Sequence, residues 1–116
     1  ERIFGWVFSP IAWLIGIPWD ESAIGGSLLG TKLVLNELVA IIQLAELAPE
    51  LSEHSIKVLT FALCGFANFG SIGIQLGGIG GIAPERRKDI AQLISKAMIG
   101  GALASWLTAT LAGILL

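Results

Sequence analysis

Two polar residues, Asn36 and Glu37, interrupt an aliphatic run that extends from Leu33 to Ile42. An ionisable side chain in apolar surroundings costs several kcal/mol unless it faces a polar cavity or a partner. Such a carboxylate therefore marks a place where the protein binds something polar or charged. The sequence therefore predicts a binding role for the carboxylate of Glu37.

A second polar pair, Asn68 and Ser71, lies in the glycine-rich segment 64–73, in the middle of an uncharged stretch, 58–83. Glycine weakens a helix, so we expect the helix to break here. Many transporters hold a substrate near the membrane midplane at a broken helix with exposed backbone dipoles. The alternative is that both side chains bridge to a neighbouring helix and only stabilise packing.

The composition indicates a membrane protein and excludes several other classes. Of the 116 residues, 54% are hydrophobic and 14% are charged, the mean hydropathy is +0.81, and segments 58–83 and 97–116, which carry no charge, are long enough to span a bilayer. A net charge of −2 with no basic stripe argues against nucleic acid binding. Paired carboxylates, metal-ligand spacings and phosphate loops are missing from the sequence, so we expect neither an enzyme nor a metal site.

The N-terminal half must position Glu37. Segment 1–21, rich in tryptophan, predicts an interfacial helix and a linker, or alternatively the cut end of a spanning helix. Segment 22–48 consists of two short apolar arms, which predicts a re-entrant helical hairpin with its tip near Gly30–Lys32. On one continuous helix, Lys32, Asn36 and Gln43 would share a stripe beside Glu37.

The C-terminal half must position Asn68 and Ser71. We expect a polar loop at 49–57, a broken transmembrane helix at 58–83, a cytoplasmic loop at 84–89 and a last transmembrane helix at 90–116. Small residues recur every four positions, which predicts close packing against other helices; they are Ala97, Gly101, Ser105, Ala109 and Gly113 in one stripe and Gly73, Gly77 and Gly81 in the other. The predicted fold class is an all-α integral membrane protein. The chain begins without Met, and we expect it to be a fragment whose missing part supplies further partners.

Two sequence blocks carry a resemblance to a known family. The first block runs from Gly30 to Ala40 and follows the pattern Gly/Ala-x-Lys-x-x-x-Asn-Glu-Phe-Val-Ala, with Leu38 where Phe is usual. The second block, Ala62 to Gly73, reads ALCGFANFGSIG. With both blocks at the expected separation, the chain resembles the C-terminal half of the concentrative nucleoside transporters, over nearly all of its length.

The resemblance implies specific roles. Glu37, Asn68 and Ser71 would bind the ribose hydroxyls, Phe66 would lie near the sugar or base, and Asn36 would complete this set of substrate-binding residues. The family recognises the nucleobase and holds its sodium ion mostly in the other half, so no cofactor is expected here beyond a coupling ion, sodium or proton. The partners would be a nucleoside, membrane lipid and the missing N-terminal half, within a homotrimer.

The implied function is therefore cation-coupled nucleoside uptake, in a bacterial inner membrane or a plasma membrane, with this chain providing the ribose-binding half of the site. The alternative is a transport-incompetent membrane domain that senses nucleosides or acts as a gate. A purely structural membrane subunit is a third possibility. In a proton-coupled parent, Glu37 could also carry the coupling charge.

Overall fold

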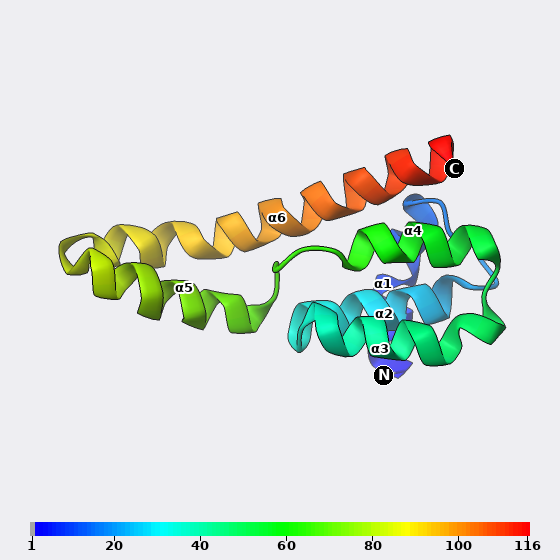
Figure 1. Cartoon of the computed structure of the whole chain (residues 1–116), viewed down its shortest axis with the longest axis horizontal. Coiled ribbons are helices and arrows are strands. Elements are labelled where there is room, and N and C mark those ends of the chain that lie inside the picture. The colour runs from blue at the N-terminus through cyan, green and yellow to red at the C-terminus, as the bar shows by residue number, and fades with distance from the viewer. Residues whose placement is uncertain (1) are drawn as a thin grey trace.

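The computed structural model describes residues 2–116, and these are almost entirely helical. The elements are α1 (Arg2–Leu14), α2 (Ser22–Val34), α3 (Glu37–Leu47), η1 (Ala48–Glu50), α4 (Glu53–Leu63), α5 (Phe69–Ile82), η2 (Pro84–Arg86) and α6 (Arg87–Leu115). Helices α1 to α4 gather at one end, and α5 lies antiparallel to the first half of α6 (Figure 1). The second half of α6 runs back along α4, so the longest helix joins the two ends of the molecule.

Helices α2 and α3 form a hairpin, but its tip differs from the prediction. The tip is at Leu35 and Asn36, whereas the sequence predicted it near Gly30–Lys32. Asn36 has an extended backbone and its side-chain oxygen accepts a 3.0 Å hydrogen bond from the Val39 amide, so it caps α3. The predicted stripe along one continuous helix was therefore wrong, because Lys32 lies on α2 and Asn36 lies between the two helices.

The glycines of α2 serve close helix packing, which explains why they do not form the tip. A Cβ atom on Gly26 would lie 2.6 Å from the Ser9 amide nitrogen, and one on Gly30 would lie 2.5 Å from Cβ of Phe4. Both neighbours belong to α1, which packs against α2. Whether α1 lies in a membrane interface stays a prediction. The predicted segment 1–21 begins one residue before the described part.

Helices α4 and α5 are the two pieces of the predicted broken helix. The break covers Cys64 to Asn68, and Gly65 within it has φ of 121°, a left-handed conformation that favours glycine. The predicted break was too long, because Gly70 and Gly73 lie inside α5. The predicted loop 49–57 was also too long: α4 begins at Glu53, because Ser52 caps it by accepting a hydrogen bond from the Ser55 amide.

Helix α6 begins at Arg87, so residues 87–89 belong to it and not to the predicted loop 84–89. Its predicted stripe of small residues faces α4 and the break: a Cβ on Gly113 would lie 2.9 Å from Val58, and one on Gly101 would lie 3.3 Å from Ala67. A Cβ atom added to Gly73, Gly77 or Gly81 would meet no atom of another part of the described chain within 4 Å. Segment 84–115 is the one helical span in residues 2–116 with the length and hydropathy to cross a membrane.

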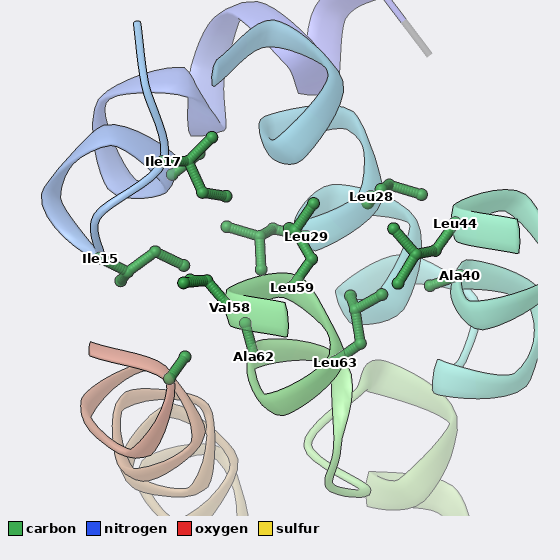
Figure 2. Packing of buried hydrophobic residues seen from close by; sticks show 12 residues of the cluster. Ile15, Ile17, Leu28, Leu29, Ala40, Leu44, Val58, Leu59, Ala62 and Leu63 are labelled. Atoms are coloured by element: carbon green, nitrogen blue, oxygen red, sulfur yellow. The ribbon is translucent and has the colours of Figure 1, made fainter. Parts of the chain in front are cut away.

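The core lies where the hairpin meets α4. Leu28 and Leu29 from α2 and Leu44 from α3 point toward Leu59 and Leu63 of α4 (Figure 2). Ile17, from the segment after α1, and Ala109, from α6, belong to the same cluster. Since α4 ends at the break, this apolar contact holds the break against the hairpin tip.

Candidate functional site

A cavity of about 320 Å³ lies between the hairpin tip and the start of α5. All five predicted site residues line it: Asn36, Glu37, Phe66, Asn68 and Ser71. The other lining residues are Leu35, Leu38, Gly70 and Ile74. The fold thus brings two short sequence blocks, about 30 residues apart, to one hollow. That these residues bind a substrate stays a prediction.

Glu37 and Asn68 are joined directly across this cavity. The side-chain nitrogen of Asn68 donates a 3.2 Å hydrogen bond to Oε2 of Glu37. Glu37 is partly exposed, while Asn68 is 5% exposed. Asn68 caps the N-terminus of α5, where the helix dipole is positive, so the carboxylate is attracted there. This contact orients Glu37. Within the described residues, Oε1 of Glu37 and the second side-chain amide hydrogen of Asn68 have no hydrogen-bond partner, so both could interact with a ligand.

Asn68 and Ser71 form a capping box that starts α5. The side-chain oxygen of Asn68 accepts a 2.8 Å hydrogen bond from the backbone amide of Ser71. Oγ of Ser71 accepts a 3.3 Å hydrogen bond from the backbone amide of Asn68. The Ser71 hydroxyl donates a 2.7 Å hydrogen bond to the backbone carbonyl of Asn68. Because its proton is used inside the box, Ser71 offers a ligand mainly an acceptor lone pair.

Phe66 and Asn36 occupy the rim of the cavity. Phe66 belongs to the break and is 76% exposed, so its ring is free to stack on a flat ligand group. Asn36 holds the start of α3 with its side-chain oxygen and so fixes the backbone next to Glu37. A smaller cavity of about 150 Å³, between α5 and α6, shares Phe66 and Ser71 with this site and adds Gln75.

Side chains from other helices satisfy the carbonyl groups at the break. Lys32 of α2 is 1% exposed, and its Nζ donates a 3.2 Å hydrogen bond to the Ala62 carbonyl. The Ser105 hydroxyl of α6 donates a 2.9 Å bond to the Cys64 carbonyl. The sequence prediction missed this use of Lys32. The available signal was that Lys32 is the one charged residue in 22–36. A lysine in such an apolar segment needs a polar partner if it is buried.

A polar cluster ties the far end of the hairpin to the start of α4. Glu21 accepts hydrogen bonds from the backbone amide of Ser52 at 3.1 Å and from its hydroxyl at 3.0 Å. Hydrogen bonding from Ser55, opposed by burial and assisted by hydrogen bonds from Ser52 and by the nearby His54, lowers the pKa of Glu21 below its ordinary value. Nζ of Lys57 pairs with Glu53 at 2.8 Å on the surface of α4. These contacts lie away from the cavity. The hydrogen bonds to Glu21 fix the start of α2 relative to the start of α4.

Known proteins match this chain closely. The family model described as "Na+ dependent nucleoside transporter C-terminus" matches residues 1–113. The chain is 54% identical over 113 residues to the uncharacterized transporter YutK of Bacillus subtilis, covering 97% of this chain and 28% of that protein. It is 38% identical over 117 residues to the nucleoside permease NupC of Helicobacter pylori (97% and 28%) and 39% identical over 130 residues to the sodium/nucleoside cotransporter 1 of Mus musculus (99% and 20%).

Solved structures match equally well. An inward-facing, substrate-bound structure of the transporter CNTnw aligns with a TM-score of 0.92 at 48% identity, covering 97% of this chain and 28% of that one. An outward-facing structure of a CNTnw variant gives 0.92 at 46% identity (97% and 28%), and an intermediate state gives 0.94 at 47% identity (98% and 28%). The chain thus spans less than a third of the length of these relatives.

Binding sites built from discontinuous helices are typical of secondary transporters of the membrane. This chain belongs to the sodium-dependent nucleoside transporter family. It corresponds to the C-terminal portion of the family's proteins. The resemblance predicted from the two sequence blocks is therefore confirmed.

Proposed function

We propose that the complete protein takes up nucleosides across a cell membrane, driven by a sodium or proton gradient, and that this chain provides the ribose-binding part of the site. The observation that carries the proposal is the Glu37–Asn68 hydrogen bond beside an open cavity. The free acceptor of Glu37 and the free donor of Asn68 suit the two adjacent hydroxyl groups of a ribose. Relatives named as nucleoside permeases and cotransporters support this substrate class.

In this proposal each of the five residues has a distinct role. Glu37 accepts a hydrogen bond from one hydroxyl, and Asn68 donates to the other. Ser71 accepts through its remaining lone pair, and Phe66 covers the sugar or base. Asn36 borders the sugar and holds Glu37 in place through the α3 cap.

The alignment with three named states supports movement of this chain as a rigid body during transport. The TM-scores lie between 0.92 and 0.94 for inward-facing, outward-facing and intermediate structures of CNTnw. Shared internal geometry in all three states is expected if the binding elements travel as one unit past a separate scaffold. The coupling ion and the nucleobase would then contact mainly the part of the protein outside this chain, within a homotrimer in a bacterial inner membrane or a plasma membrane.

The test is concentrative uptake of labelled uridine into proteoliposomes that contain the complete protein. We expect the internal uridine concentration to exceed the external one under an inward sodium or proton gradient, and the excess to vanish when an ionophore collapses that gradient. Saturable uridine binding without accumulation would favour a sensing or gate-like domain. A Glu37→Ala variant with unchanged uptake would favour a purely structural role.

A further inference from the structure

The tip region of the hairpin carries two opposite charges, Lys32 and Glu37, and each lies at one end of the break between α4 and α5. Lys32, on α2, lies at the carboxyl end of α4, and Glu37, at the start of α3, lies at the amino end of α5. A helix dipole is negative at its carboxyl end and positive at its amino end. Each charge is therefore placed next to the helix end that attracts it.

Lys32 is in an unusual setting for an ammonium group. It is 1% exposed, and its Nζ donates to the Ala62 carbonyl, one of the last four carbonyls of α4, which have no partner within a helix. A Cβ atom built on Gly65 would lie 4.0 Å from the same Nζ, which places the ammonium beside the left-handed residue of the break. Burial disfavours the charged form of this group, and the Glu37 carboxylate opposes that effect. A buried charge keeps such a position only when dipoles and an opposite charge compensate its lost hydration.

We propose that Lys32 is a built-in cation of the nucleoside site, which holds the carboxyl end of α4 and balances the Glu37 charge. The inference rests on the function proposed above. Lys32 does not line the cavity, so it is a positioning residue that acts through Glu37 and through the break that ends at Asn68. In this proposal, uridine affinity depends on the positive charge of Lys32, and not only on its hydrogen bond or on the volume of its side chain.

The test is chemical rescue in the complete protein. Lys32→Ala removes a propylammonium-sized group, and we expect uridine affinity to fall by at least about tenfold, as for loss of a charge-assisted interaction. Added propylammonium should restore affinity and raise the thermal unfolding temperature of the variant, while propan-1-ol, which is similar in size but neutral, should not. Lys57→Met, which removes a lysine from the exposed surface of α4, should bind uridine like the wild type.

Other outcomes would overturn the proposal. Unchanged uridine affinity in Lys32→Ala would show that the charge is not needed, and equal rescue by propan-1-ol would show that only volume matters. If Lys32→Ala does not fold even with propylammonium, Lys32→Gln and Lys32→Arg decide: weakened affinity in the neutral Lys32→Gln with near-wild-type affinity in the charged Lys32→Arg supports the proposal, and equal affinity in the two variants contradicts it. A wild-type protein that fails to bind uridine would refute the proposed function alone, because the propylammonium-dependent unfolding temperature still tests the built-in cation.

Discussion

The carboxylate of Glu37, at the start of α3, accepts a 3.2 Å hydrogen bond from the side-chain amide of Asn68, which caps α5. The two residues are 31 positions apart and belong to different elements, a hairpin tip and a helix break. Their contact places the Glu37 carboxyl group at the amino end of α5, where the helix dipole is positive. A ligand that enters the cavity therefore meets a preoriented acceptor beside a preoriented donor.

Asn68→Ala should affect both stability and binding. Loss of the α5 cap should lower the free energy of unfolding by about 0.5 to 2 kcal/mol, and Glu37 should lose its orienting donor. Ser52→Ala is the matched control, since it removes the cap of α4 at a distance from the cavity. Thermal unfolding and uridine titration of the complete protein measure the two effects. Equal binding losses in both variants would show that Asn68 acts through helix stability alone.

Gly26→Ala should destabilise the contact between α1 and α2. A Cβ atom there would lie 2.6 Å from the Ser9 amide nitrogen and 2.7 Å from the Gly5 carbonyl oxygen, and backbone cannot yield easily. We expect a loss of about 1 to 3 kcal/mol in the free energy of unfolding, measured by thermal unfolding. Gly100→Ala is the control, because α6 has open space at that position in the described chain. A Gly26→Ala protein as stable as the Gly100→Ala protein would contradict the packing described for α1.

Glu21 should make stability depend on pH at the far end of the hairpin. Hydrogen bonds from Ser55 and Ser52 lower its pKa in the folded state, so its contribution is complete above the ordinary carboxyl pKa and disappears as the pH falls through the lowered folded value. The group is close to solvent, so the loss should not exceed about 1 kcal/mol. At neutral pH the wild type should unfold at a higher temperature than Glu21→Gln. The difference between the two unfolding temperatures should shrink as the pH is lowered and Glu21 becomes protonated. Asp20→Asn, at the exposed neighbouring carboxylate, should retain the wild-type pH dependence.

Local signals explain which parts of the fold were predictable. A lone carboxylate in an aliphatic run and glycines in an uncharged stretch are visible within a few residues, and they correctly indicated a hairpin and a break. The four-residue spacing from Ala97 to Gly113 likewise identified the face of α6 that meets α4.

The errors came from tertiary contacts. The sequence predicts the tip near Gly30–Lys32, but Gly30 is used for close contact with Phe4 of α1, and Asn36 ends the first arm by capping the second. Gly70 stays helical because the Asn68 capping box starts α5 immediately before it. The partner of Lys32 was also invisible, because Ala62 is 30 positions away and offers only a backbone carbonyl.

The most direct test of the ribose-binding claim is a thermodynamic cycle that combines Glu37→Gln with removal of single ribose hydroxyls. Uridine, 2′-deoxyuridine and 3′-deoxyuridine are titrated into the complete wild-type protein, into Glu37→Gln and into Glu46→Gln, a control at an exposed carboxylate of the same helix. Glu37→Gln should weaken uridine binding by about 1.5 to 3 kcal/mol, since a charge-assisted hydrogen bond is lost.

The deoxyuridine that lacks the hydroxyl bound by Glu37 should be insensitive to the Glu37→Gln change within a few tenths of a kcal/mol, which gives a coupling energy of about 1 kcal/mol or more between the carboxylate and that hydroxyl. The Glu46→Gln protein should behave like the wild type with all three ligands. If Glu37→Gln weakens uridine and both deoxyuridines equally, or weakens none of them, Glu37 does not bind the ribose and the central claim is contradicted.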